Sequence, residues 1–161
     1  MDSETMAAIA AAACFLVAAL ACSRSEEAGI WLGIAGAAFL AASLIARGWG
    51  KRVWPFCTSY EFSLSFALAA ALSALLVRRK QERLAPSPQT STIRAAAMAM
   101  AASLIVYARI IVPAVSRNVQ PLPLAPSSVL CMLHVGTAAM GYGALAVAGL
   151  AGVVCLRQGP G

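Results

Sequence analysis

The sequence has few charged residues and only one histidine. Of its 161 residues, 11% are charged and 61% are hydrophobic, and the mean hydropathy is +0.81. A nucleophile with an adjacent base, a phosphate-binding loop and a cluster of metal ligands are all missing from the sequence pattern. The sequence therefore indicates no catalytic residue and does not predict an enzyme that works alone.

Long apolar runs recur instead, and each is long enough to cross a hydrocarbon core of about 30 Å. The runs lack an alternation with a period of two and are rich in alanine and leucine, so they predict helices rather than strands. The predicted spans are residues 6–22, 29–46, 60–77, 93–112 and 127–156. We therefore expect one all-α domain, a polytopic membrane bundle of about five transmembrane helices.

Two of these helices have recognisable starts. Thr58 or Ser59 can cap the third helix, and Glu61 in its first turn complements the positive helix end. The leader of the first segment, MDSET, is acidic, whereas a signal peptide begins with positive charge. We expect this segment to stay as a helix; the alternative is cleavage before Cys22, where Ala-Leu-Ala-Cys resembles a lipoprotein site.

The loop at residues 78–94 carries five cations and one glutamate. Because cations accumulate in cytoplasmic loops, this loop is predicted inside, which puts the N-terminus outside and the C-terminus in the cytoplasm. The net charge of +6 then follows from topology, and no nucleic-acid surface is expected. Five cations nevertheless fall outside, which favours an anionic ligand on that side: Arg47, Lys51, Arg52, Arg109 and Arg117.

Three ionisable residues are predicted near the outer membrane surface. His134 precedes Leu156 by 22 residues, or about 33 Å of helix. Glu61 and Arg109 reach a similar depth on neighbouring helices, where a charge is costly unless it is paired or faces a wet cavity. For Glu61 and Arg109 the alternatives are an ion pair that only fixes helix packing and a role in binding. His134 is either an interfacial hydrogen-bonding residue or a ligand.

Small residues share the helix face of His134. Gly141, Ala148 and Gly152 recur on this face, and small side chains let a second helix approach closely in lipid. The pattern predicts that the last helix packs against a partner on its histidine side.

The five cysteines form no CxxC pair and no zinc-binding spacing. Cys57 and Cys131 are both predicted outside, where an oxidising compartment permits a disulfide. The alternative is two free thiols.

Two stretches resemble the CcsA (ResC-type) family, the haem-handling proteins of cytochrome c biogenesis. Residues 47–62 contain Arg-Gly-Trp, Trp-Pro-Phe and the pair Tyr60-Glu61, and they are similar to the family's outer loop and the helix after it. Residues 112–145 contain Val-Pro, His134-Val and Gly141-Tyr142-Gly-Ala, and they are similar to the family's next outer loop and its His-Val…Gly-Tyr-Ala helix.

The resemblance implies that His134 is an axial ligand to the iron of transiently held haem b on the extracytoplasmic side. It also implies that Arg109 and Arg52 pair with the haem propionates, which are carboxylates. The chain would then be part of a cytochrome c synthase (haem lyase) complex in a bacterial plasma membrane or a thylakoid-type membrane. Its partners would be haem, the lipid bilayer and apocytochrome c.

The sequence departs from the family after the last predicted helix. The family continues into a Trp-Asp segment with a second outer histidine and a membrane histidine, and residues 157–161 contain none of these. The chain also has no CxxCH motif, so it is not itself a c-type cytochrome. We therefore expect a split or truncated protein whose missing half, or a partner membrane protein, carries those residues. The alternative is a structural subunit of a transporter or respiratory complex without haem function.

Overall fold

The computed structural model describes residues 3–22, 24–51, 58–81, 88–112 and 129–158. These residues form five α-helices, so the predicted all-α bundle is confirmed. Each helix contains a segment long and apolar enough to cross a membrane, consistent with an integral membrane protein. The helices are α1 (Ser3–Ala21), α2 (Glu26–Lys51), α3 (Ser59–Gln81), α4 (Pro88–Ile110) and α6 (Val129–Gln158).

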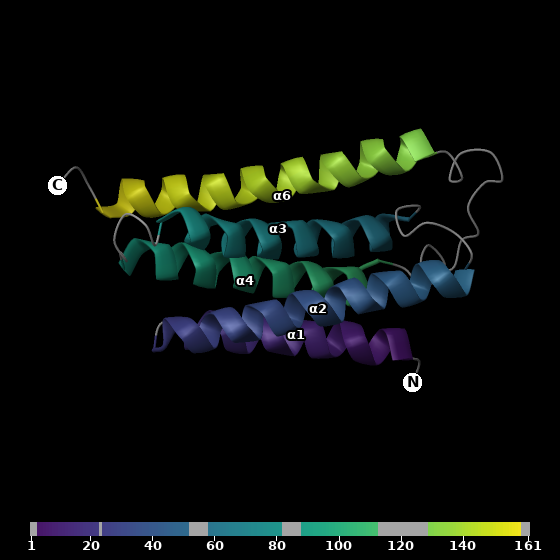
Figure 1. Ribbon diagram of the computed structural model, residues 1–161, viewed down its shortest axis with the longest axis horizontal. Helices are drawn as coiled ribbons and strands as arrows, with labels where there is room; N and C mark the ends of the chain where they lie inside the picture. The colour runs from purple at the N-terminus through teal and green to yellow at the C-terminus, as the bar shows by residue number, and fades with distance from the viewer. Residues whose placement is uncertain (1–2, 23, 52–57, 82–87, 113–128, 159–161) are drawn as a thin grey trace.

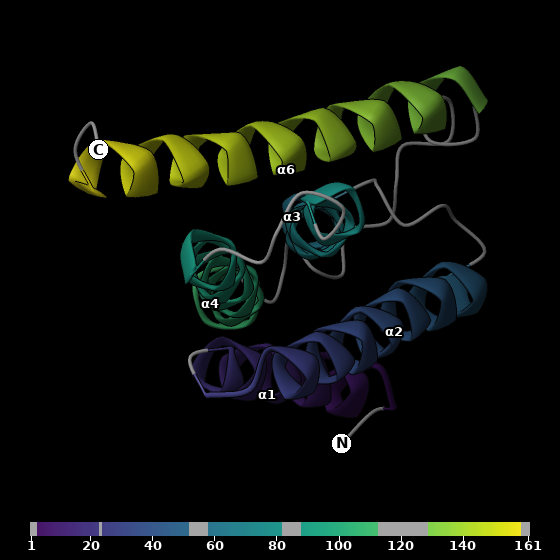
Figure 2. The ribbon, with the colours of Figure 1, turned by 60° about the vertical axis from the view of Figure 1, so that its left-hand side comes forward.

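The helices are arranged in three layers (Figures 1 and 2). α1 packs against α2 and α4, and α3 forms the centre, where it contacts α2, α4 and α6. Within the described part of the chain, α6 contacts only α3 and α4. It is therefore the peripheral helix, and most of its surface is open.

Two helices begin or end away from the predicted boundaries. α2 continues to Lys51, through residues that the sequence suggested were a loop. The extension arises because Arg47 lies on the buried face of α2 and finds carboxylate partners there. α4 begins at Pro88, inside the predicted linker, because proline suits the first turn of a helix, where its missing N–H is not needed.

Small residues let the helices approach one another closely. Phe15 of α1 is fully buried, and a Cβ at Gly36 of α2 would lie only 2.8 Å from its ring. On α6, a Cβ at Gly143 would lie 2.7 Å from the Cβ of Ala69 and 2.8 Å from the backbone nitrogen of Ala70, both on α3. Gly143 therefore sets the distance between α6 and the rest of the bundle.

Gly141, Ala148 and Gly152, the small residues of the predicted partner face of α6, point away from this contact. A Cβ added at Gly141 or Gly152 would meet no described atom within 4 Å, and Ala148 is exposed. No described residue of this chain covers that face, so the predicted partner helix stays a prediction.

Candidate functional site

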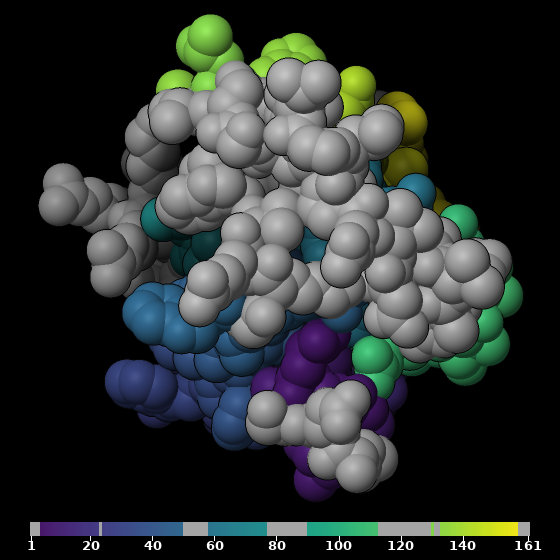
Figure 3. All heavy atoms as spheres, turned by 90° about the vertical axis from the view of Figure 1, so that its right-hand side faces the viewer, coloured from purple at the N-terminus to yellow at the C-terminus, as the bar shows by residue number. Residues whose placement is uncertain are grey.

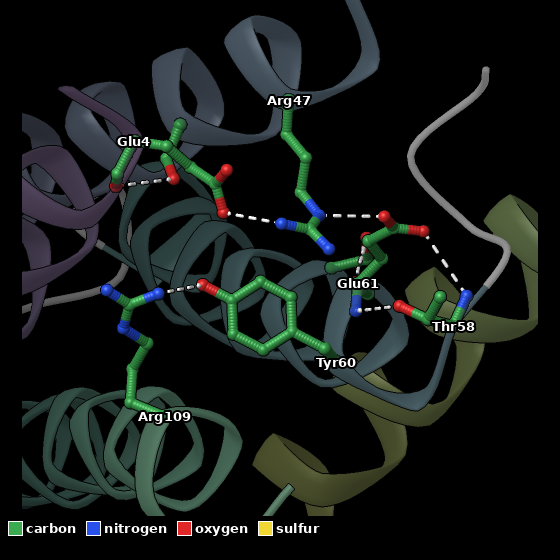
Figure 4. A network of polar contacts seen from close by, with 8 residues as sticks. Glu4, Arg47, Thr58, Tyr60, Glu61 and Arg109 are labelled. Atoms are coloured by element: carbon green, nitrogen blue, oxygen red, sulfur yellow. Dashed lines mark hydrogen bonds and ion pairs between the residues drawn. The ribbon is translucent and has the colours of Figure 1, made fainter. Parts of the chain in front are cut away.

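Polar side chains from four helices meet at the end of the bundle where α2 ends and α3 begins (Figure 4). Viewed from this end, α1 and α2 lie on one side and α6 on the opposite side (Figure 3). α1 contributes Glu4, α2 contributes Arg47, α3 contributes Tyr60 and Glu61, and α4 contributes Arg109. We call these five residues the outer network, after the predicted orientation.

Arg47 is the centre of the outer network. Its Nη1 donates to Glu4 Oε1 at 2.8 Å and its Nε donates to Glu61 Oε1 at 2.8 Å. The guanidinium also lies 4.7 Å from the centroid of the Tyr60 ring, within the range of a cation–π contact. The Arg47 side chain is only 5% exposed. A buried guanidinium is tolerated because two carboxylates and an aromatic face replace its hydration.

Glu61 also ties the network to the start of α3. The backbone N–H of Thr58 donates to Glu61 Oε2 at 3.2 Å, and the backbone N–H of Glu61 donates to Thr58 Oγ1 at 3.3 Å. These reciprocal bonds are a capping box, so the predicted cap at Thr58 is confirmed. One carboxylate thus fixes both the helix start and the position of Arg47.

Arg109 contacts Tyr60 rather than Glu61. Its Nη1 donates to the Tyr60 hydroxyl at 3.0 Å, and the guanidinium lies 5.8 Å from the ring centroid. The first alternative, an ion pair between Glu61 and Arg109, is therefore not formed, although both residues are at the same end. Glu61 is engaged by Arg47, which the sequence placed in a loop, and Arg109 contacts the Tyr60 hydroxyl instead.

A pocket of about 460 Å³ lies at the same end, between the first turns of α3, the end of α4 and the first half of α6. It adjoins the other face of α3 from Tyr60 and Glu61. Aromatic walls come from Phe62 and Tyr107, and His134 lies on the α6 side. The residues that line it are Thr58, Ser59, Phe62, Ser63, Tyr107, His134, Val135 and Ala138.

The His134 imidazole is exposed and makes no hydrogen bond with the part of the chain that the structure describes. Only its backbone is engaged: the His134 carbonyl accepts a hydrogen bond from Thr137 Oγ1 at 3.0 Å. Its two ring nitrogens are therefore available to a ligand or partner. Among the described residues, no group of three or more histidine, cysteine or acidic side chains is placed to hold a metal ion.

The other predicted site residues are not brought to this pocket. Arg109 is directed to Tyr60 and is not among the lining residues. Tyr142 is 57% exposed on α6, next to the open Gly141. Arg52 lies outside the described residues.

Sequence reasoning missed three residues at this end. Glu4 reads as part of an acidic leader, Arg47 as a loop cation, and Tyr107 as one more residue of an apolar span. A usable signal existed for Arg47, because the apolar pattern of α2 can be continued past residue 46 with the arginine on the inner face.

Cys14, Cys22 and Cys155 are free thiols. The predicted disulfide between Cys57 and Cys131 depends on side chains outside the described set. Cys22 is buried in the α1–α2 turn, and burial raises the pKa of its thiol, although the nearby Arg94 opposes this shift.

We expect Cys22 to react slowly with a maleimide at neutral pH. Burial limits access, and the raised pKa leaves less thiolate, which is the nucleophile. In single-cysteine variants in micelles, Cys22 should react at least about tenfold more slowly than the exposed Cys155, and raising the pH should speed its alkylation. Gly29→Ala is the matched variant, since its Cβ would displace the Cys22 sulfur and should accelerate the reaction. Equal rates at the two cysteines would contradict this packing.

Comparisons of the chain with family models, with curated proteins and with solved structures found no match. The fold and the site define an all-α bundle of membrane-spanning type with a polar network and an open pocket at one end.

Proposed function

We propose that the chain is a haem-handling subunit of cytochrome c biogenesis in which His134 provides one axial ligand. The supporting observation is the state of this imidazole: it is exposed, it has no hydrogen-bond partner among the described residues, and it lines a pocket with aromatic walls. A neutral imidazole with a free ring nitrogen is a common ligand of haem iron. The resemblance of residues 47–62 and 112–145 to the CcsA family points to the same ligand.

The residues present fit one face of a haem. Phe62, Tyr107 and Val135 offer apolar and aromatic surface to a flat macrocycle, and His134 offers the nitrogen. When bound, haem is the group that becomes attached to apocytochrome c. The chain's own residues bind and orient it, and the open side of the pocket leaves the opposite face to a partner that carries a second ligand.

A propionate partner requires a change in the outer network. Arg109 is held by the Tyr60 hydroxyl, a neutral acceptor. A carboxylate accepts a stronger, charge-assisted hydrogen bond. Arg109 would therefore release the Tyr60 hydroxyl and bind a propionate that came within reach. Arg52 remains the second candidate.

Replacement of His134 by alanine tests the proposal. Purified with a candidate partner that carries a Trp-Asp segment, the wild-type chain should show a Soret band, and His134→Ala should lose most of it. Thr137→Ala is the matched control, because Thr137 is exposed one turn along α6 and its hydroxyl bonds only to the backbone. Added imidazole should restore part of the band in His134→Ala, since it replaces the missing ligand.

The competing proposal is a structural subunit that only assembles a larger membrane complex. The open face of α6 favours it, because Gly141, Gly149 and Gly152 leave room for another helix. Absence of haem from every preparation, or a Soret band unchanged in His134→Ala, would reject the ligand role and leave this function.

A further inference from the structure

A second polar cluster lies at the opposite end of the bundle. It consists of Cys22 in the α1–α2 turn, Glu26 at the start of α2 and Arg94 near the start of α4. Arg94 is the largest fully buried side chain of the described residues, with 1% of its surface exposed. Its Nη1 donates to Glu26 Oε1 at 2.9 Å, which links α4 to α2.

The rest of the Arg94 guanidinium has no acceptor in the described part of the chain. Nε and Nη2 are buried, and neither makes a hydrogen bond with a described residue. These two nitrogens form one edge of the planar group, with parallel N–H bonds that match two oxygens of a carboxylate or phosphate. Buried donors are almost always satisfied, and leaving a charged donor unsatisfied is costly, so a bound ion or water is one explanation for such a group.

Among the described neighbours of Arg94, no oxygen completes this edge, and the Cys22 thiol, which interacts with Arg94, is only a weak acceptor. Glu26 uses Oε1 on Nη1, the other side of the guanidinium. The Cys22 sulfur packs against Gly29, where a Cβ would collide with it, and it lies beside Arg94. Burial raises the pKa of this thiol, so it is neutral at physiological pH and is a weak acceptor. An external group is needed to complete the edge.

The charge at this end favours an anion. The described residues at this end include three arginines and two glutamates: Arg24, Arg94 and Arg157 against Glu26 and Glu27. α2 and α4 both begin at this end, and helix N-termini attract anions. Glu26 and Arg94 lie at or near the ends of the apolar spans Glu26–Trp49 and Thr90–Ile110, the level at which lipid headgroups are found.

We propose that the Nε–Nη2 edge of Arg94 is a binding site for a phosphate group. The group is either the headgroup phosphate of an anionic phospholipid or free phosphate, since both present the same paired oxygens. Both nitrogens are closed to water in this conformation. Binding therefore requires α4 and the α1–α2 turn to separate slightly, and we place this opening beside Glu26, whose side chain is 38% exposed.

The test uses the full chain and two probes. Inorganic phosphate is titrated against protein in neutral micelles, and bound lipid is counted by native mass spectrometry after reconstitution in phosphatidylcholine with or without phosphatidylglycerol. We expect saturable binding of at least one probe. Lipid binding without phosphate binding identifies the headgroup as the source, and binding of both identifies the phosphate group in general.

Two variants have opposite expected effects. Arg94→Lys keeps the charge but loses the paired donors, so affinity should fall at least about tenfold. Glu26→Gln keeps an oxygen for Nη1 but removes a competing negative charge, so affinity should rise by roughly threefold or more. Arg24→Gln is the control, because Arg24 is an exposed cation of the same turn and its loss should change affinity by less than about twofold.

A purely structural role for Arg94 gives a different pattern. Absence of saturable binding of either probe, or binding that is equal in the wild type and Glu26→Gln, would overturn the proposal and leave Arg94 with a role in helix packing only. Glu26→Gln decides the matter even if Arg94→Lys fails to fold.

Discussion

Replacing Arg47 by alanine should lower the free energy of unfolding by about 3–5 kcal/mol. Glu4 and Glu61 each accept a hydrogen bond of 2.8 Å from this guanidinium. Its removal would leave both carboxylates in the outer network without their shared cationic partner. The loss of its contact with the Tyr60 ring adds to the cost. Reversible unfolding in mixed micelles, followed by far-ultraviolet circular dichroism, measures the change.

The charge, rather than the bulk of the side chain, should account for most of this loss. In the triple variant Arg47→Met, Glu4→Gln, Glu61→Gln, no carboxylate is left to desolvate, and much of the stability should return. Arg24→Ala is the matched single-cation control and should stay within about 0.5 kcal/mol of wild type, as surface substitutions usually do. A loss below about 1 kcal/mol for Arg47→Ala would mean that the network behaves as an exposed ion pair.

Replacing Gly143 by leucine should separate α6 from α3. The added Cβ would meet the backbone of Ala69 and Ala70 at 2.8 Å, and backbone atoms of a packed helix cannot give way as a flexible side chain can. We expect a loss of about 1–3 kcal/mol or more. We also expect a wider spin-label distance between α3 and α6.

Gly141→Leu provides the control for this substitution. Gly141 lies two residues away on the same helix, and a Cβ added there would meet no described atom within 4 Å. This variant should fold with wild-type stability or slightly better, because glycine is a poor helix former. Equal losses in both variants would indicate a general effect of leucine on α6 and would contradict the close α3–α6 contact.

The first turns of α3 connect the network and the pocket. Tyr60 and Glu61 face the network, whereas Ser59, Phe62 and Ser63 line the pocket. Because the two sets lie on opposite faces of the same helical turns, a change in the network should move the pocket wall. The Soret band proposed to depend on His134 should therefore be compared only between variants whose free energies of unfolding have been measured.

Much of the fold followed from the sequence. A continuous apolar run of about 20 residues has few stable conformations in a bilayer other than a helix, so five helices could be counted and placed to within a few residues. The cap at Thr58 was also predictable, because a capping box is a local pattern that depends on residues three positions apart. His134 could be singled out as the only histidine of the sequence, and its predicted depth in the membrane stays a prediction.

The partners of the charged residues were decided by the tertiary structure. Sequence spacing determines depth along each helix but not the rotation of one helix against another. It could therefore bring Glu61 and Arg109 to one level without showing that Glu61 bonds to Arg47 and Arg109 to Tyr60. The same rotation buries Gly143 and opens Gly141, and it leaves one edge of Arg94 inside the bundle without an acceptor among the described residues. Local patterns determined the five helices, whereas the contacts between their faces determined the network, the pocket and the unfilled guanidinium.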